Sequence, residues 1–336
     1  MYIILVDWVD NGDFFLHKEL LKKKIEHQII GIPDYNIKDR ITKIGSIRLY
    51  FKYLKLAIKA VKESTNQDVI ICWNFTTSIA VGIVCFILKR QRKILGLNII
   101  APPHKGVLET VRNGLFGAIM RRQDFLVTVN SKEYIKDYGK RFNISDSKFR
   151  VLNDPCLDIE NFLKFTNKQS FVFCGGEAHR DFETLFLAAQ MLPEIKFICI
   201  ARLKFFNSTI EKPDNVELFF DTTPSFFYEK MNQCSIVAIP LNSYLPCGLI
   251  ILLKAASMGK PVIATRTPST SNYIINGSTG FLIEKKDVSD LVDKIGLLIH
   301  DIPLQSNIVN NMQNYLKINH SEKSYTNNLI TIIDQI

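Results

Sequence analysis

The sequence of 336 residues contains no apolar run long enough to cross a membrane as a helix. Its longest uncharged apolar run, Ser78–Leu88, has 11 residues, whereas a helix that spans the hydrocarbon core of a bilayer needs about 20. The opening residues MYIILVDWVD also lack the basic stretch of a secretory signal peptide. We therefore expect a cytoplasmic protein that is soluble or peripheral to the inner face of the cell membrane.

Motifs that hold metals, disulfides, dinucleotides or nucleic acids are also missing. The seven cysteines are odd in number and have no CxxC or CxxH spacing, which indicates reduced core thiols rather than a zinc site or a disulfide framework. No GxGxxG follows the first strand-like run. No RNP, KH, zinc-finger or helix-turn-helix signature is present. We predict no metal site, no organic cofactor and no nucleic-acid partner.

The positive charge is concentrated in the first half of the chain. The net charge is +9, and residues 1–165 carry 27 Lys and Arg against 17 Asp and Glu, so the remaining residues are close to neutral. A basic half joined to a neutral half indicates an acidic partner such as an anionic membrane surface or a phosphorylated lipid. Solubility without any partner is the alternative interpretation.

Apolar, strand-like runs alternate with helical patterns along the whole chain. This alternation predicts an α/β protein with two Rossmann-like, doubly wound domains that face each other across a cleft. We place the first domain at residues 1–165 and the second at residues 166–310, because a polar linker lies between them. The helices of residues 311–336 are expected to pack back toward the first domain.

One predicted helix of the first half carries a cationic stripe. Between Ser46 and Glu63, basic residues recur every three or four positions while apolar residues fill another face. The basic residues are Arg48, Lys52, Lys55, Lys59 and Lys62. The stripe is consistent with a solvated outer helix and equally with a helix that docks on an anionic membrane.

Ligands of open α/β sheets bind at the carboxyl ends of the strands. In the first half, Asn11, the pair Trp73 and Asn74, and the pair His104 and Lys105 follow strand-like runs. Of the six histidines, His104 is the one in such a place, and an imidazole there can act as an acid or a base. A purely structural histidine is an equal alternative.

The second half contains the residue types of a phosphate site. Gly175 and Gly176 follow the strand-like run FVFC, and Arg180 precedes the next helix. Glycines allow backbone N–H groups to approach an anion, a helix amino terminus adds partial positive charge, and arginine neutralises phosphate oxygens. Arg202, after the following strand, is a second candidate cation. A simple tight turn is the alternative interpretation of the glycine pair.

The stretch Pro240–Thr265 reads as one strand–helix–strand crossover. Gly248 begins its helix, and the helical run that follows is apolar except for Lys254. An unpaired ammonium is costly to bury, so we expect Lys254 to be paired or to lie at a crevice.

Several segments in order resemble one family. These are DFLVTVNSKEYIKDYGKRF, VLNDPCLDIENF, FCGGEAHRDFETLFLAA and, most clearly, residues 247–295, which begin CGLIILLKAASMGKPVIAT. They resemble the retaining nucleotide-sugar glycosyltransferases of GT-B fold, the glycosyl transferases group 1 or family 4-like proteins. The resemblance implies a metal-independent hexosyltransferase that moves a sugar from a nucleotide-diphosphate sugar to a lipid-linked or glycan acceptor in the synthesis of cell-surface polysaccharides or glycolipids.

The resemblance also implies roles for individual residues. Arg180 corresponds to the basic residue on the donor diphosphate, His104 to the active-site histidine, and Thr222 to the loop that lines the nucleobase. We predict catalytic roles for His104, Arg180 and Lys254. Predicted donor-binding residues are Gly175, Gly176, Arg180, Arg202, Thr222, Cys247, Gly248 and Leu249, and predicted acceptor-side residues are Asn11, Trp73, Asn74, His104 and Lys105.

The sequence departs from the family at its paired glutamates. Their positions, eight apart, are taken by Pro246 and Lys254. The second glutamate normally accepts hydrogen bonds from the ribose, and a lysine can only donate. Two alternatives to a transferase therefore stay open. One is a non-catalytic GT-B protein that binds a glycan or stabilises a partner, and the other is a GT-B sugar-nucleotide epimerase or a phosphorylase.

Overall fold

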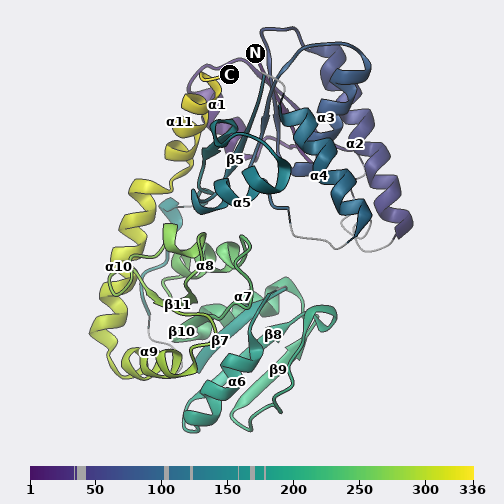
Figure 1. The fold of residues 1–336 in the computed structure, drawn as a ribbon. Coiled ribbons are helices and arrows are strands. Elements are labelled where there is room, and N and C mark those ends of the chain that lie inside the picture. Colours follow the sequence, from purple (N-terminus) through teal and green to yellow (C-terminus); the bar gives the residue numbers. More distant parts are fainter. Residues whose placement is uncertain are drawn as a thin grey trace. The chain divides into compact units, whose positions relative to one another are not determined.

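The structure is a computed structural model that describes residues 1–33, 35, 43–101, 106–121, 124–157, 159–166, 171–177 and 179–336. The chain divides into two compact units. Unit 1 comprises residues 1–155 and 322–336, and unit 2 comprises residues 156–321. Each unit contains a six-stranded sheet with helices packed on it (Figure 1). The predicted α/β class with two doubly wound halves is confirmed.

The sheet of unit 1 has the strand order β2-β1-β3-β4-β5-β6, and every neighbouring pair is parallel. Its strands are β1 (Tyr2–Leu5), β2 (His27–Ile30), β3 (Val69–Cys72), β4 (Lys93–Gly96), β5 (Phe125–Val129) and β6 (Phe149–Val151). Its helices are α1 (Phe15–Lys22), α2 (Lys43–Glu63), α3 (Phe75–Ile87), α4 (Val107–Met120), α5 (Glu133–Phe142) and α11 (Glu322–Ile333).

Side-chain alternation along the strands explains the two cores of unit 1. Ile3 and Leu5 of β1 pack into the core under α2, α3 and α4, whereas Ile4 packs into the core under α1 and α11. Successive side chains of a strand point to opposite faces. A strand covered on both faces is therefore continuously apolar, as the run Tyr2–Leu5 is.

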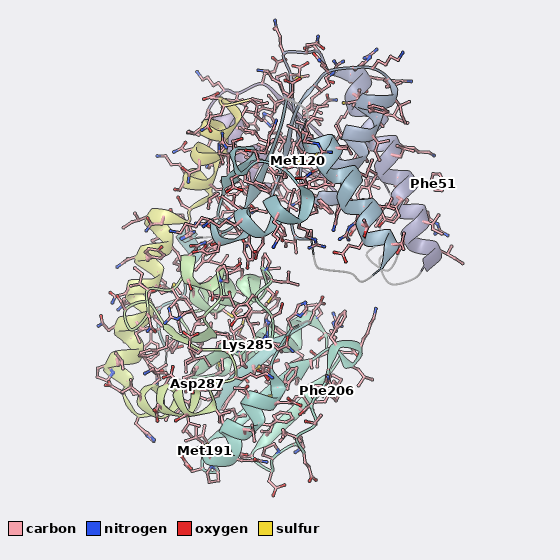
Figure 2. The ribbon with its side chains drawn as sticks, in the orientation of Figure 1. Phe51, Met120, Met191, Phe206, Lys285 and Asp287 are labelled. Carbon is pink, nitrogen blue, oxygen red and sulfur yellow. The ribbon has the colours of Figure 1, made fainter. Side chains whose placement is uncertain are left out.

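The predicted basic helix is observed as α2. It buries Leu49, Tyr53 and Leu56 against the sheet, which leaves its cationic stripe on an outer face. Phe51, labelled in Figure 2, is also on the outer side and is 63% exposed. The helix therefore presents both charge and apolar surface to solvent.

The sheet of unit 2 has the strand order β12-β11-β10-β7-β8-β9, again parallel throughout. Its strands are β7 (Phe171–Gly176), β8 (Lys196–Ala201), β9 (Val216–Phe220), β10 (Ile236–Ile239), β11 (Val262–Thr265) and β12 (Phe281–Ile283). Its helices are α6 (Phe182–Met191), α7 (Pro224–Gln233), α8 (Leu249–Ser257), α9 (Val288–His300) and α10 (Ile302–Asn319).

The division between the units lies ten residues before the predicted boundary. Cys156 is buried in unit 2, where its N–H donates to the carbonyl of His320, and the N–H of Leu163 donates to Ser257. The polar linker near residue 165 therefore follows a segment that already belongs to unit 2.

The C-terminal helices belong to different units. Helix α10 packs on α8 and α9 of unit 2, whereas α11 packs on α1 of unit 1. In that second contact, the rings of Phe15 and Tyr325 lie 5.4 Å apart. The prediction treated residues 311–336 as one segment, but only those from residue 322 onward join unit 1. The reason is the apolar face of α11, which completes the core beside β1 and β3.

The cysteines lie mainly in the cores. Six of the seven are buried, and Cys247 is half-buried. Within the described ranges, no group of three or more His, Cys, Asp or Glu side chains is arranged to hold a metal ion. Among the helices of those ranges, none is both long and apolar enough to cross a bilayer.

Candidate functional site

Three loops meet at the carboxyl edge of the unit 2 sheet. The N–H of Asp181, after β7, donates to the carbonyl of Pro240 over 3.0 Å, and the N–H of Asn242 donates to His179 over 3.1 Å. The N–H of Leu241 in turn donates to the hydroxyl of Thr265, at the end of β11, over 2.8 Å. These bonds fasten the loops after β7, β10 and β11 to one another.

Arg180 is held at the centre of this edge. Its backbone pairs with Leu241 in an antiparallel bridge, and its side chain is 7% exposed. The guanidinium Nε donates to the carbonyl of Gly175 over 2.8 Å. Burial lowers the pKa of Arg180 from its ordinary value, yet a guanidinium stays charged at neutral pH. A buried positive charge therefore lies where the sequence predicts a phosphate site.

The glycine pair makes room for two side chains. A Cβ on Gly176 would lie 2.4 Å from a terminal nitrogen of Arg180, and Gly176 has a φ of +149°. A Cβ on Gly175 would lie 2.5 Å from the ring of Phe227. The pair was predicted to admit an anion to the backbone. That role stays a prediction, and the structure adds that the lack of side chains at the pair lets the Arg180 guanidinium and the Phe227 ring pack against β7.

The amino end of α8 lies beside Arg180. Gly248 caps the amino end of α8 and has a left-handed φ of +83°. Its carbonyl accepts a hydrogen bond from the N–H of Leu252, in the first turn of the helix. Burial raises the pKa of the preceding Cys247 thiol, while the charge of Arg180 acts on the same thiol and lowers its pKa. The helix start also lies close to the partner of Arg180, because an added Cβ on Gly248 would lie 3.5 Å from the side chain of Leu241, whose backbone pairs with Arg180. The predicted residues Arg180, Cys247 and Gly248 are therefore brought together.

Lys254 lies further along α8, away from the helix amino end. Its ammonium is 5.8 Å from the centre of the Tyr228 ring, which belongs to α7. The side chain is half-buried, and none of the described acidic groups forms an ion pair with it in the structure. Lys254 was expected to be paired or to lie at a crevice, and the group that its ammonium faces is an aromatic ring, which attracts a cation through its negative quadrupole.

Arg202 and Thr222 lie at the ends of β8 and β9. The guanidinium of Arg202 forms ion pairs with Glu177 at 3.2 Å and with Asp221 at 3.7 Å. Thr222 follows Asp221 and is half-buried, next to the residue that caps α7. Arg202 is about half exposed and already paired, so its charge is less available to a phosphate than that of Arg180.

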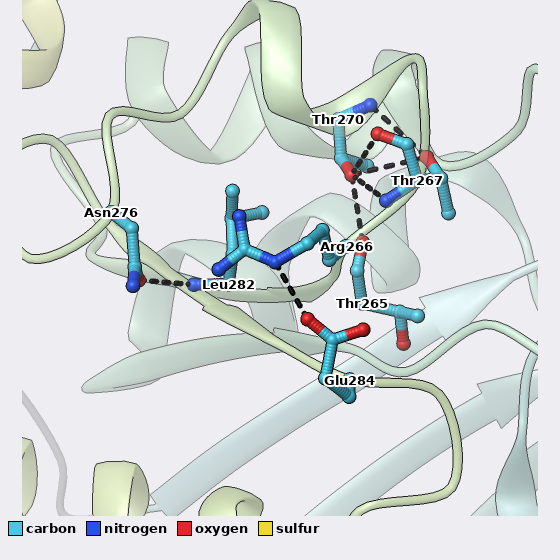
Figure 3. A network of polar contacts seen from close by, with 7 residues as sticks. All are labelled: Thr265, Arg266, Thr267, Thr270, Asn276, Leu282 and Glu284. Carbon is cyan, nitrogen blue, oxygen red and sulfur yellow. Dashed lines mark hydrogen bonds and ion pairs between the residues drawn. The ribbon is translucent and has the colours of Figure 1, made fainter.

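A threonine network, which is not among the features predicted from the sequence, stiffens the loop after β11 (Figure 3). The hydroxyl of Thr270 donates to the carbonyl of Thr265 over 2.7 Å and accepts from the N–H of Thr267 over 2.9 Å. Beside it, Arg266 forms an ion pair with Glu284 at 2.7 Å. The sequence feature that could have indicated this network is the close spacing of threonines after a strand, because threonine side chains often form hydrogen bonds with the backbone of their own loop.

The unit 1 residues predicted on the acceptor side fall into three groups. Trp73 and Asn74 line a cavity of about 440 Å³ after β3. Asn11 is exposed in the loop after β1 and does not line this cavity. His104 and Lys105 lie outside the described residues.

Asn74 is fixed by three bonds within unit 1. Its side-chain oxygen accepts from the N–H and the hydroxyl of Thr77, so it caps α3, and its amide donates to Asp7. A capped helix start is rigid. The cavity wall formed by Trp73 and Asn74 is therefore preorganised.

Comparison with known proteins relates most of unit 2 to a known family. Residues 201–315 match the family model described as glycosyl transferases group 1. The matched region, which makes up most of unit 2, is a group 1 glycosyltransferase domain. The family named from the sequence segments is thereby confirmed. This domain contains α8, Lys254 and the threonine network.

Solved structures share the fold of the chain. HepE of Anabaena in complex with UDP and glucose has a TM-score of 0.65 at 16% identity, and both chains are covered completely. Sucrose-phosphate synthase of Thermosynechococcus elongatus has a TM-score of 0.69 at 14% identity, covering 100% of this chain and 98% of that one. At these identities the similarity shows the fold, which is GT-B.

Curated relatives match over part of their lengths. The capsular polysaccharide biosynthesis glycosyltransferase CapM of Staphylococcus aureus is 29% identical over 54% of this chain and 50% of its own. An uncharacterized glycosyltransferase of Methanocaldococcus jannaschii is 32% identical over 29% of this chain and 26% of its own. The chain thus matches half or less of the length of either relative.

Proposed function

We propose that this protein is a glycosyltransferase that takes a sugar from a nucleotide-diphosphate sugar bound by unit 2. The observation that carries the proposal is the buried guanidinium of Arg180 beside the amino end of α8, within a unit that contains a group 1 domain. Both groups attract the negative charge that a departing diphosphate develops. The similarity to HepE, solved with UDP, supports the donor class.

The proposal assigns roles to several residues of unit 2. Arg180 binds the diphosphate and stabilises it as it leaves, and the N–H groups of Gly248 and Leu249 donate to phosphate or sugar oxygens. Lys254, half-buried on Tyr228, donates to the ribose or the sugar. Thr222 lines the nucleobase. His104 is a candidate for the sugar-side histidine on sequence grounds alone.

The proposed reaction retains the configuration of the sugar. In a same-face attack, the bond from the anomeric carbon to the leaving phosphate breaks while the bond to the acceptor oxygen forms, and the phosphate takes the acceptor proton. No pair of carboxylates is then required. A buried arginine supplies the positive charge that a metal ion would otherwise bring to the diphosphate.

The acceptor side of the proposal concerns unit 1. The CapM relative supports a role in cell-surface polysaccharide synthesis. The cationic stripe and exposed apolar residues of α2 support binding to the anionic inner face of a membrane. Flotation with anionic liposomes at low salt tests this part, and recovery of the protein only in the unbound fraction would contradict it.

Donor binding is tested by thermal shift with UDP-, GDP-, ADP- and CMP-sugars. One nucleotide class should stabilise the protein, and Arg180→Ala should lose that shift. Arg180→Lys retains a charge at the site and should keep part of it. Lys196→Ala is the matched control. Lys196 is an exposed, ion-paired cation at the amino end of β8, whereas Arg180 lies at the carboxyl edge of the same sheet. An unchanged shift in Arg180→Ala would refute the phosphate assignment.

A non-catalytic GT-B protein is the second candidate. It is favoured by the replacement of both family glutamates by Pro246 and Lys254. Such a protein would show neither stabilisation by any nucleotide sugar nor release of nucleotide from one. Release of UDP or another nucleoside diphosphate in the presence of an acceptor would rule it out.

A further inference from the structure

Leu241 contacts both groups that are proposed to hold the donor diphosphate. Its backbone pairs with that of Arg180 in an antiparallel bridge. Its side chain lies against the start of α8, where an added Cβ on Gly248 would be 3.5 Å from its Cδ1 atom. Leu241 itself is fully buried. The positions of the guanidinium and of the amino end of α8 therefore depend on where this one residue lies.

The bridge turns the N–H of Leu241 away from Arg180. The hydrogen bonds of the bridge are made by the residues that flank the pair, with the N–H groups of Asp181 and Asn242 as donors. Arg180 and Leu241 are thus a non-hydrogen-bonded pair, and their own N–H groups point outward from it. A buried N–H in this position needs an acceptor on its other side, where β11 lies.

Thr265 supplies this acceptor with its side chain. In the ladder between β10 and β11, the N–H of Val237 donates to the carbonyl of Pro261. Continued along the same register, the N–H of Leu241 would meet the carbonyl of Thr265. That carbonyl accepts instead from the hydroxyl of Thr270 over 2.7 Å (Figure 3). The N–H of Leu241 donates to Oγ1 of Thr265 over 2.8 Å, so a hydroxyl takes the place of the ladder carbonyl.

The hydroxyl of Thr265 is itself held in place. The N–H of Arg266 donates to the carbonyl of Ile283 over 2.7 Å, which continues the pairing of β11 with β12. The side chain of Thr265 is buried, and branching at Cβ restricts its rotamers. An acceptor that is fixed in this way determines the position of Leu241 and does not follow it.

We propose that Thr265 is a positioning residue of the donor site. By accepting the N–H of Leu241, its hydroxyl sets the position of the Arg180 guanidinium relative to the amino end of α8, so that both meet the same diphosphate. The inference rests on the proposed function, because the donor diphosphate is the ligand concerned. Without the hydroxyl, the buried N–H of Leu241 has to turn toward another acceptor, and this movement displaces the backbone of Arg180.

Binding of inorganic pyrophosphate tests the proposal in the full chain. This anion carries two linked phosphates without the base, the ribose or the sugar. Thr265→Val keeps the shape of the side chain but removes the acceptor, and calorimetry should give a Kd about tenfold higher than for the unmodified protein. Thr265→Ser retains the hydroxyl and should keep Kd within about threefold. An unchanged Kd in Thr265→Val, or equal rises in the two variants, would overturn the proposal.

Thr279→Val is the matched control for a purely structural effect. Thr279 is also buried, and its hydroxyl accepts the N–H of Ile275 over 2.8 Å. It precedes β12, which is parallel to β11, so it lies at the amino edge of the sheet. This variant should be less stable in urea and yet keep Kd for pyrophosphate within about twofold, because the two sites are far apart. A rise in Kd equal to that of Thr265→Val would contradict a positioning role.

A double-variant cycle tests whether Thr265 acts through Arg180. In a protein that already contains Arg180→Ala, adding Thr265→Val should raise Kd by no more than about threefold, because the charge that the hydroxyl positions is gone. The full rise of about tenfold in that background would mean that the two residues act independently, and the proposal would be wrong.

Stabilisation by UDP-, GDP-, ADP- and CMP-sugars, measured on the same samples, separates this proposal from the proposed function. If a nucleotide sugar stabilises the protein and Thr265→Val binds pyrophosphate normally, the positioning role alone is wrong. If pyrophosphate binding depends on Thr265 but no nucleotide sugar stabilises the protein, the transferase proposal alone fails. If the unmodified protein does not bind pyrophosphate, the phosphate site is wrongly assigned and the positioning role falls with it.

Discussion

Arg180 is the residue on which the proposed donor site depends. Its guanidinium is buried, bonded to the carbonyl of Gly175 and packed over Gly176. Each of these features orients the charge before a ligand arrives. A preoriented charge loses little entropy on binding and is not weakened by surrounding water.

Gly176→Ala should displace Arg180. The new Cβ would lie 2.4 Å from the guanidinium in a backbone with φ of +149°, and such strain costs about 1–3 kcal/mol. We expect lower stability in urea and loss of stabilisation by the donor nucleotide.

Gly277→Ala is the control for Gly176→Ala. Gly277 also has a positive φ, +78°, but an added Cβ there meets no atom within 4 Å. This variant should lose stability while keeping the nucleotide shift. Equal nucleotide shifts in the two variants would contradict the assigned role of Gly176.

Lys254→Met should weaken donor binding without unfolding the protein. Methionine replaces the apolar stem that packs near Tyr228 but removes the ammonium 5.8 Å from the ring centre. We expect Kd for the donor, measured by calorimetry, to rise about tenfold, the loss of one charged hydrogen bond. Lys230→Met, another lysine over an aromatic ring, is the control. An unchanged Kd would show that Lys254 does not contact the donor.

At the scale of elements, loops rather than helices complete the unit 2 site. Helix α8 begins beside Arg180 only because the loops after β7 and β10 bond to each other and the loop after β11 bonds to Leu241. The threonine network beyond Thr265 holds that last loop. A site assembled from loops on a parallel sheet is precise when the loops are tied in this way.

Thr270→Val should destabilise unit 2. Valine has nearly the same shape but leaves the buried N–H of Thr267 and the carbonyl of Thr265 without their partner, at a cost of about 1–3 kcal/mol. Urea denaturation should show this loss. Ser289→Ala removes an exposed hydroxyl in the same unit and should change stability by less than about 0.5 kcal/mol. Equal effects would mean that the network does not stabilise the loop.

At the scale of the whole molecule, the two units differ in continuity. Unit 2 is one continuous segment, whereas unit 1 needs α11 from the end of the chain. Helix α11 buries Tyr325, Leu329, Ile332 and Ile333 in the core beside β1 and β3.

Removal of residues 322–336 should unfold unit 1 selectively. Each large apolar side chain buried by α11 contributes about 1.5–3 kcal/mol, so their sum approaches the whole stability of a domain. Calorimetry should show loss of one thermal transition, with the nucleotide-stabilised transition of unit 2 retained. Leu329→Ala should lower the unit 1 transition, and Asn328→Ala, exposed on the same helix, should not. An intact unit 1 transition after truncation would contradict this account.

Much of the fold could be predicted from the sequence. Strand and helix periodicity is local, so the runs around β1, β11 and α2 predicted those elements. Family segments such as residues 247–295 indicated the group 1 domain that the comparison confirmed. The position of Arg180 just before a helix, four residues after Gly176, also pointed to the carboxyl edge of the sheet.

Only the tertiary structure decided what those residues contact. Gly175 and Gly176 leave space into which Phe227 and Arg180 pack. The ammonium of Lys254 faces an aromatic ring on another helix. The cavity beside Trp73 combines three segments that are distant in sequence. Contacts of this kind depend on side-chain direction and on which strands become neighbours. Local periodicity contains no information on side-chain direction or on which strands become neighbours. The sequence by itself therefore determined the elements and the family, whereas the fold determined which residues of the proposed sites come together.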